Sequence, residues 1–513
     1  MRVRWVSSFV AGLLVTACAE PLPVVEICSE GDPRPAVRLP PSGRTRLVYS
    51  TTVDGRPQLY LLDFDRPGAA PERLDAIGTG PGPLRLDGNV SNPAGVWSPA
   101  GGRVAVALGD AIFEPARVGV IDVASPGTVR ELGGDILAFP PFERAREAWS
   151  PHGDHLVESD PAGGVVRVLR ADGGGAEVIA SGIPGTLADA TWSPDGRYVG
   201  FEAWDDDSTM FYVSPADAAD PRPVASYNYR WGRAGSQVLG YVDDRHWEAI
   251  DIEAGRRTLL EASTGSVPVY SADGRWLLTP SPPAMRPACG GDPVLVAGAP
   301  PHAMDPRATA DGDHIVFQAM NQAGGLDAST AWVLDRVGDR WEARHVYTPT
   351  MSPPRVDAPV VSATGSRVAW VLAVGATQQF LVTRDGVRDP KPVAAVGIVQ
   401  QVSPNTHWFS PDLRRLAYLA GTVEQATLRV LDLEDPAAPV MLGELVAPGQ
   451  PIVWASWSPN GNALAYVAGP GFSVPPPVTH ELFAVEVTGG ALGAPRALGS
   501  TVHPHNDVYD WEP

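Results

Sequence analysis

Residues 192–196 read Trp192-Ser193-Pro194-Asp195-Gly196, and this short pattern recurs along a chain of 513 residues. In its full form it is an aromatic residue, Ser, Pro, a polar residue and Gly, followed by an alternation of apolar and polar residues. Other full copies begin at Trp97, Trp149 and Trp457, and weaker copies begin at Trp231, Tyr270, Ala308, Val361 and Phe409. The nine copies are 38 to 53 residues apart, a period that indicates either propeller blades or helical solenoids.

The local chemistry of the pattern favours strands over helices. Ser-Pro-Asp-Gly fits a type I turn, because proline presets φ at the second position while Ser and Gly suit the first and fourth. After the turn, apolar residues alternate with residues that face the other way, as in Val199 and Phe201 or Leu464 and Tyr466. Two more strand patterns follow in each repeat. Each repeat is therefore predicted to be a four-stranded antiparallel meander.

A single meander leaves both faces of its sheet uncovered, so copies must stack face to face, and the stable arrangement for four-stranded units is a radial ring. The 54 glycines and 53 prolines agree with a chain that turns often. The predicted fold class is all-β, a β-propeller of about ten four-stranded antiparallel blades. The repeat-motif residues with a structural role, as wedges between blades, are Trp97, Trp149, Trp192, Trp231, Tyr270, Phe409, Trp457 and Trp511.

The two ends of the repeat region complement each other. The first repeat lacks an opening motif and begins with the strand pattern Leu47–Ser50, whereas Val508–Pro513 is an opening strand with nothing after it. We expect the C-terminal strand to pair with the N-terminal strands and close the ring, which brings the count to ten blades. Ten exceeds the usual four to eight, so two rings with a break near Pro280–Pro306 are the alternative.

The Trp-Ser-Pro-Asp-Gly units resemble the repeats of TolB-type β-propellers, the WD-repeat-like blades that are also found beside prolyl-oligopeptidase-type peptidase domains. The resemblance covers roughly residues 45–513 and implies the fold much more than a function. TolB-type proteins carry a separate α/β domain before the propeller, and this chain has only a proline-rich stretch there. The resemblance therefore implies none of TolB's particular partners for this chain.

The N-terminus has the layout of a secretory signal. Arg2 and Arg4 precede a short apolar run that reaches Ala17-Cys18, and the run is too short for a membrane-spanning helix. Small residues just before a cysteine resemble the lipobox of bacterial lipoproteins, which implies cleavage before Cys18 and lipidation of its thiol. An ordinary cleaved signal is the alternative. Ala19, where an aspartate would imply inner-membrane retention, favours the outer membrane by the same resemblance.

The predicted domain organisation is a signal peptide at 1–17, a Pro-rich tether at 18–44 and the propeller at 45–513. Proline at the density of the tether gives a semi-extended segment. Cys28 in the tether and Cys289 in the propeller are the remaining cysteines. Export places them where disulfides persist, so the two are either a disulfide or two free thiols.

Charge and motifs restrict the function classes. A net charge of −20 argues against nucleic acid as a partner, because phosphate backbones are bound by basic surfaces. The signatures Gly-x-Ser-x-Gly, His-Glu-x-x-His, Gly-x-x-x-x-Gly-Lys-Ser/Thr and Cys-x-x-Cys are absent from the sequence. We therefore predict no catalytic residue, no metal and no cofactor.

Three polar clusters are candidate sites. His503–Asp507 offers two imidazoles and a carboxylate to a metal, and Asp205–Asp207 offers carboxylates to calcium. His152 and His155 lie at a motif turn and on the strand after it. In each case a loop or turn role is the simpler interpretation, because the first precedes the closing strand and the second lacks the glycine and distal glutamate of a calcium loop.

The function expected from the sequence is that of an exported, lipid-anchored binding or scaffold protein of the bacterial cell envelope. Its expected partner is an envelope protein or a glycan. The alternative is an enzyme that acts on a polysaccharide or peptide at the mouth of the central channel, where loops from several blades converge. A purely structural envelope protein is a third class. Histidines and carboxylates gathered at the channel would favour the enzyme.

Overall fold

The computed structural model describes residues 43–513 except 54–55, 67, 75–95, 109–115, 137–145, 161–162, 206–207, 226–228, 233–234, 236, 244, 262–266, 289–290, 322–327, 339, 349–354, 357–358, 375–376, 394–406, 421–426, 448–449, 471–478, 489 and 502–508. Regular structure in these residues is almost entirely β, with one short 3₁₀ turn at 146–148. None of their helical segments has the length and hydropathy of a membrane span. The strands form ten separate sheets.

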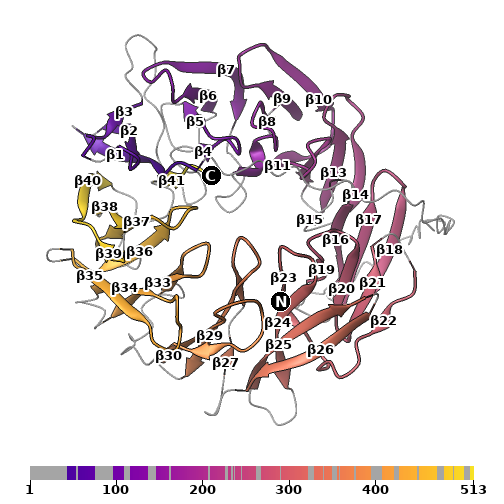
Figure 1. Cartoon of the computed structure of the whole chain (residues 1–513). Helices are drawn as coiled ribbons and strands as arrows, with labels where there is room; N and C mark the ends of the chain where they lie inside the picture. Colours follow the sequence, from indigo (N-terminus) through magenta and orange to yellow (C-terminus); the bar gives the residue numbers. More distant parts are fainter. Residues whose placement is uncertain are drawn as a thin grey trace, which may run out of the picture.

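Each sheet is one blade, and the blades follow one another around a single central opening (Figure 1). Blades 1 to 5 contain β1 (Arg46–Val53), β2 (Arg56–Asp63), β3 (Glu72–Arg73) and β41 (Tyr509–Trp511); β4 (Val96–Trp97), β5 (Arg103–Leu108), β6 (Ala116–Asp122) and β7 (Val129–Ile136); β8 (His155–Asp160), β9 (Val165–Arg170) and β10 (Ala176–Ser181); β11 (Thr186–Trp192), β12 (Tyr198–Trp204), β13 (Thr209–Pro215) and β14 (Arg222–Ala225); and β15 (Tyr229–Trp231), β16 (Gln237–Asp243), β17 (His246–Asp251) and β18 (Arg256–Glu261).

Blades 6 to 10 continue the ring. They contain β19 (Val269–Tyr270), β20 (Trp276–Pro280), β21 (Pro283–Pro287) and β22 (Val294–Leu295); β23 (Met304–Ala308), β24 (His314–Asn321), β25 (Ala328–Val337) and β26 (Arg340–Tyr347); β27 (Arg355–Val356), β28 (Val360–Val361), β29 (Val368–Val374), β30 (Thr377–Val382) and β31 (Lys391–Pro392); β32 (His407–Phe409), β33 (Arg415–Ala420), β34 (Thr427–Asp432) and β35 (Val440–Leu445); and β36 (Ile452–Trp457), β37 (Ala463–Ala468), β38 (His480–Thr488), β39 (Ala491–Leu492) and β40 (Arg496–Thr501).

The prediction of ten antiparallel blades in a propeller is confirmed. Blade 3 departs from the four-strand pattern, because its first strand is reduced to one bridge between Trp149 and Leu156. Blades 8 and 10 each carry one additional short strand.

The segment 280–306, considered from its prolines as a break between two rings, instead continues the sheets. β21 pairs with β20, and Pro280 lies opposite Pro283 at the hairpin end. β22 then completes blade 6, and β23 opens blade 7. The prolines cluster at strand ends and next to the turn, where a missing N–H interrupts few ladder hydrogen bonds. The interpretation of this segment as a break is therefore wrong.

The Ser-Pro-Asp-Gly turns form as expected. In eight of them the amide N–H of the fourth turn residue donates to the carbonyl of the first at 2.8–3.1 Å; these donors are Gly101, Gly153, Gly196, Gly274, Gly312, Gly365, Leu413 and Gly461. The Ser hydroxyl also donates to the carboxylate of the third turn residue, as in Ser193 to Asp195 at 2.7 Å. Gly196 has φ +73°, the left-handed conformation that glycine adopts without strain. Leu413 adopts the same conformation, with φ +55°.

The core of the molecule lies between the blades. The described part contains eight buried hydrophobic clusters, and each combines residues of neighbouring blades. Phe317 of blade 7 packs in one cluster with Met285 of blade 6, for example. A blade is thus stabilised by its neighbours on both sides, as in other repeat architectures.

The ring closes in blade 1. β41 pairs antiparallel with β1, and Trp511 lies opposite Leu47, so the predicted closure by a C-terminal strand is confirmed. Glu512 forms a two-bonded ion pair with Arg46, and the side chains are 1% and 8% exposed. Arg46 also lies over the ring of Trp97, 5.3 Å from its centroid. The closing strand is therefore held by pairing, burial and charge together.

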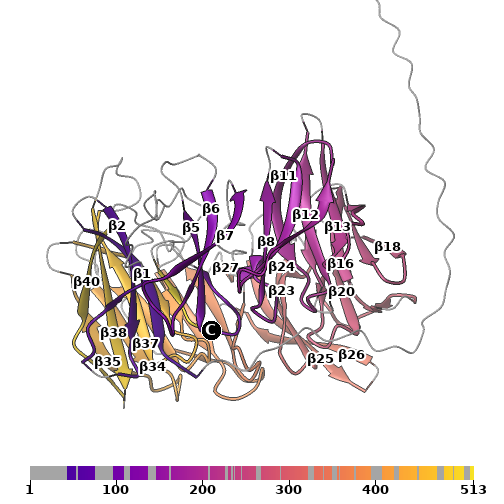
Figure 2. The ribbon, with the colours of Figure 1, turned by 90° about the horizontal axis from the view of Figure 1, so that it is seen from above.

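The two ends of the ring differ in their connections, as the view at right angles shows (Figure 2). One end carries the motif turns and the connections between third and fourth strands. In seven blades the motif turn places five residues between the first and second strands, for example 193–197 between β11 and β12. The opposite end carries the hairpins between second and third strands and the links between blades. These connections range from residues 281–282 to residues 74–95.

Candidate functional site

The motif aromatics lie at the boundaries between blades. Six of them are at most 7% exposed, and Trp231 and Phe409 are half-buried; the six are Trp97, Trp149, Trp192, Tyr270, Trp457 and Trp511. These side chains belong to the hydrophobic clusters described above. Their position fits a role as wedges between blades.

Five of the indole N–H groups donate to the preceding blade at one equivalent position. The acceptor is always the residue immediately before the motif aromatic of that blade. The bonds run from Trp97 to Asp510 O (3.1 Å), Trp149 to Val96 O (3.1 Å), Trp231 to Thr191 Oγ1 (3.2 Å), Trp457 to Trp408 O (3.0 Å) and Trp511 to Ser456 Oγ (3.1 Å). These indoles therefore join the inner strands of successive blades around the opening. Their N–H groups have a structural role.

The residues expected to carry the lipid and the disulfide, Cys18, Cys28 and Cys289, lie outside the described residues. So do residues 502–508, which include both histidines of the His503–Asp507 cluster. Lipidation, the Cys28–Cys289 pairing and a metal role for that cluster stay predictions.

In the other two polar clusters His155 and Asp205 are engaged locally, whereas Asp206 and Asp207 lie outside the described residues. His155 Nδ1 is 3.0 Å from the carboxylate of Asp154, and its ring lies beside Trp192 with centroids 6.2 Å apart. Asp205 accepts from the backbone N–H and the hydroxyl of Ser208 at 2.6 and 2.9 Å. Within the described part, no three His, Cys, Asp or Glu side chains are arranged to hold a metal ion.

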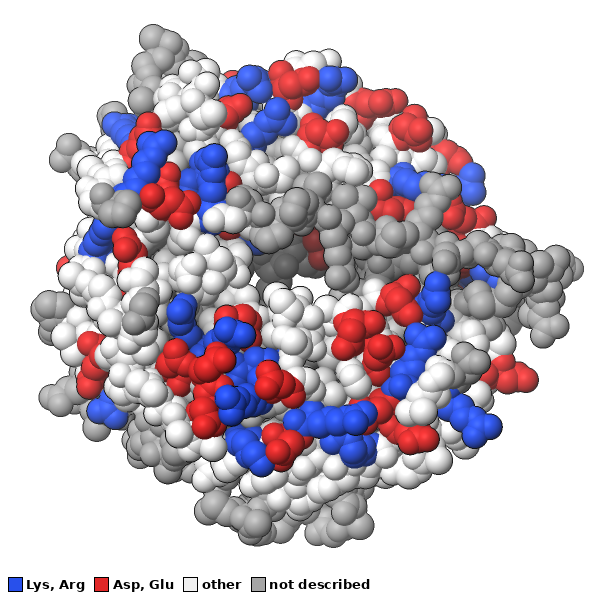
Figure 3. All heavy atoms as spheres, in the orientation of Figure 1, with Lys and Arg blue, Asp and Glu red and all other residues white. Residues whose placement is uncertain are grey.

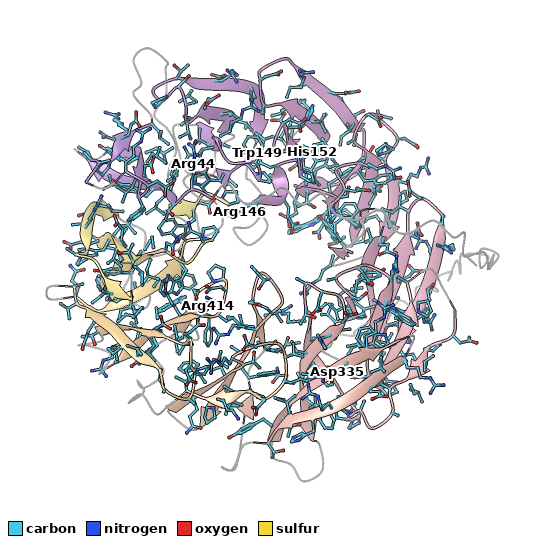
Figure 4. All side chains as sticks on the ribbon, in the orientation of Figure 1. Arg44, Arg146, Trp149, His152, Asp335 and Arg414 are labelled. Carbon is cyan, nitrogen blue, oxygen red and sulfur yellow. The ribbon has the colours of Figure 1, made fainter. Side chains whose placement is uncertain are left out.

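A charged cluster in blade 7 was not identified from the sequence. Asp335 at the end of β25 receives His314 Nδ1 at 2.8 Å and Arg344 Nε at 3.0 Å, and Arg388 lies 3.7 Å away. Figure 4 shows Asp335 away from the central opening. Burial alone would raise the pKa of Asp335, but the hydrogen bonds from His314 and Arg344, with their positive charge, lower it to about 2. The cluster joins the three strands β24, β25 and β26 and includes Arg388 from blade 8.

Asp335→Asn is expected to make the unfolding free energy depend less on pH in the acid range. The folded pKa of about 2 lies below the unfolded value of about 3.9, so the ionised Asp335 stabilises the fold above pH 4 and this stabilisation is lost as the pH falls towards 2. Between pH 5 and pH 3 the wild type should lose about 1 kcal/mol more of its unfolding free energy than the variant. Urea unfolding at the two pH values measures this.

Asp313→Asn is the matched control, because Asp313 is an exposed carboxylate on the motif turn directly before His314. Equal pH sensitivity of wild type and Asp335→Asn would contradict the assigned role of the cluster.

The inner wall of the ring carries charged residues at two strained positions. Asp189 in β11 and Asp305 in β23 have φ of +51° and +47°, and both occur where the register shifts within the first strand of a blade. Asp305 accepts from Gln318 Nε2 at 2.6 Å. Arg146, close to the opening in Figure 4, donates to Asp510 Oδ1 at 2.6 Å. The hydrogen bonds of Asp305 and Asp510 therefore hold the first strands of their blades in place. Figure 3 shows acidic and basic side chains intermixed around the central hollow.

A hydroxyl–imidazole pair lies at the end of the ring opposite the motif turns. Ser281 Oγ, in the β20–β21 connection, is 3.0 Å from His302 Nδ1, and both side chains are half-buried. In the described part His302 has no carboxylate partner of the kind that orients the imidazole in Ser-His-Asp triads. No sequence pattern indicates this pair, because its members are 21 residues apart and belong to different connections.

No family model matches this sequence, and no curated protein matches it. Solved structures with similar folds include TolB from Acinetobacter baumannii, at 14% identity and TM-score 0.26, covering 67% of this chain and 79% of that one. They also include the tricorn protease, at 12% identity and TM-score 0.29, covering 86% and 49%. A prolyl endopeptidase structure is similar at 16% identity and TM-score 0.34, covering 78% and 55%. The chain thus spans about half the length of these two peptidases, and what it shares with all three is the propeller fold.

Proposed function

We propose that this protein is an exported, lipid-anchored binding protein of the bacterial cell envelope, held to a membrane through Cys18. Its propeller presents the end opposite the motif turns to an envelope partner. The sequence pattern Arg2 to Cys18 supports the anchor, and the proline-rich residues 18–44 supply the reach from the membrane to the ring.

The observation that carries the binding role is the contrast between the uniform motif turns and the connections at the opposite end of the ring. The motif turns are uniform in length and their side chains are used in turn and blade-to-blade contacts. The connections at the other end vary widely in length, and variable loops on a rigid scaffold are where recognition concentrates in other proteins. The partner surface is therefore assigned to that end.

Cys18→Ser is expected to abolish membrane association, because the thiol that would receive the lipid is gone. Fractionation of cells and incorporation of labelled palmitate measure the effect, and Cys28→Ser is the matched control that should behave as wild type. Palmitate incorporation that persists in Cys18→Ser would contradict the anchor. Crosslinking in intact cells, followed by capture of the wild-type protein, then tests for an envelope partner.

A hydrolytic function is the second candidate, and the Ser281–His302 pair favours it. A serine hydroxyl 3.0 Å from an imidazole is part of the arrangement that activates a nucleophile. The purified propeller would be assayed on peptide and polysaccharide substrates, beside Ser281→Ala. Turnover that depends on Ser281 would replace the binding proposal with an enzymatic one.

A further inference from the structure

Trp204 is the exception among the tryptophans. Of the fourteen whose placement the structure describes, it alone is exposed, with 48% of its surface accessible, whereas the others are buried or half-buried. It lies at the end of β12, on the end of the ring to which partner binding is assigned. In Figure 2 the strands β11, β12 and β13 of blade 4 reach the upper end of the ring.

The indole of Trp204 is fixed in place rather than loose on the surface. Its N–H donates to Glu202 Oε2 at 2.9 Å, from a residue on the same face of the strand. The loop that follows is also held, since Asp205 accepts both the amide and the hydroxyl of Ser208. A fixed aromatic ring loses little conformational entropy when a ligand covers it.

This hydrogen bond also sets the chemistry of the ring. The face of an indole carries a negative potential that attracts cations, and a carboxylate that accepts the indole N–H makes the ring still more electron-rich. Thr186 and Thr209 lie directly opposite Trp204 on the neighbouring strands. Their hydroxyls flank the indole without adding any positive charge that would compete for the ring.

The electrostatic surroundings point in the same direction. Between Ala176 and Pro215 the sequence carries seven acidic residues and one basic residue, Arg197. Arg197 lies on the motif turn, at the far end of the blade, and is paired with Glu253. The sequence around the hairpin that bears Trp204 is therefore predominantly acidic.

We propose that Trp204 and Glu202 form a recognition site for a cationic side chain, Arg or Lys, of a partner protein. The cation lies over the exposed indole face while the Glu202 carboxylate supplies charge complementarity. This assignment rests on the proposed binding function and specifies the partner's chemistry.

The test uses the full-length protein labelled with 5-fluorotryptophan, in which the ¹⁹F signal of Trp204 is the one that Trp204→Phe removes. The probe is the acetylated, amidated peptide Gly-Arg-Gly-Arg-Gly, and its counterpart has citrulline, the neutral isostere, in place of both arginines. The Arg peptide is expected to shift the Trp204 signal and the citrulline peptide to leave it unchanged. An unmoved Trp204 signal, or equal shifts with both peptides, overturns the proposal.

Two charge variants separate the site from the general attraction of an acidic protein for a basic peptide. Glu202→Gln keeps an acceptor for the indole N–H and removes one charge, and Asp172→Asn removes one charge from an exposed position at the motif end. Glu202→Gln should weaken Arg-peptide binding about threefold to fivefold, Trp204→Ala about fivefold, and Asp172→Asn hardly at all. Equal weakening by Glu202→Gln and Asp172→Asn would overturn the proposal.

A neutral glycan is the competing ligand class, tested with maltohexaose on the same sample. A Trp204 shift with the glycan that Glu202→Gln leaves intact, without a response to the Arg peptide, would assign the site to sugars instead. Crosslinking distinguishes failure of the Trp204 site from failure of the proposed binding function. Partners captured equally by wild type and Trp204→Ala reject this site and leave the binding function standing, whereas no captured partner and a measured turnover reject the function itself.

Discussion

Removal of Val508–Pro513 is expected to lower the free energy of unfolding by at least about 5 kcal/mol. The deletion removes β41 from blade 1 and exposes the unpaired edge of β1. It also removes the buried indole of Trp511, a loss of about 3–5 kcal/mol for a large core side chain. Arg46 would keep its buried position without its carboxylate partner, which adds a further penalty.

Urea or thermal unfolding of the truncated protein measures this effect. Deletion of Pro513 alone is the control, because it leaves β41 and Glu512 in place. If the truncated protein unfolds at the same midpoint as the full chain, β41 contributes nothing to closure and the ring is stable with an incomplete first blade.

The buried pair Arg46–Glu512 should show strong energetic coupling. Glu512→Gln and Arg46→Met each leave one charged or polar partner buried without its counterpart, and each is expected to cost about 3 kcal/mol. The double variant removes both charges together, so it should be less destabilised than the sum of the single variants by at least about 1 kcal/mol. Chemical unfolding of the four proteins gives the coupling energy.

Arg336→Met with Asp273→Asn provides a comparison cycle for a more exposed pair that also joins two blades, at 3.2 Å. This cycle should give a coupling energy below about 1 kcal/mol. Similar coupling energies in both cycles would show that burial does not strengthen the Arg46–Glu512 pair, contrary to the role assigned to it.

The fold could be predicted because its signals are local. A turn of the type Ser-Pro-Asp-Gly is specified by its own four residues, and the alternation that follows it is read within one strand. The limits of local information appear at Trp149, where the pattern is complete and yet only one bridge forms. They appear again at Leu413, which occupies the position and conformation of the expected glycine while its side chain is buried in the core.

The contacts that matter for sites were beyond the sequence pattern because they join distant residues. Arg46 and Glu512 are 466 positions apart, and nothing in either segment indicates the other. The Asp335 cluster joins the start of β24 to β25 and β26 through sheet pairing. The wedge role of the tryptophans was expected, but the acceptor position of their N–H groups depends on how adjacent blades are aligned around the ring.

Trp204 illustrates a different limit. In the sequence it reads as one more aromatic residue in a strand, with an acidic turn after it. Its exposure depends on where the end of β12 lies relative to the neighbouring blades, which only the assembled ring defines.

The composite first blade imposes an order on folding as the chain is synthesised. β1, β2 and β3 are made first, but their fourth strand consists of residues 509–511, so the β1 edge stays open until nearly the whole repeat region has been made. Blades 2 to 10 can pair and stack before closure, because the strands of each are contiguous in the chain. Closure therefore brings together segments separated by more than 400 residues, and such long-range contacts form slowly. Until closure the β1 edge stays exposed and prone to aggregation.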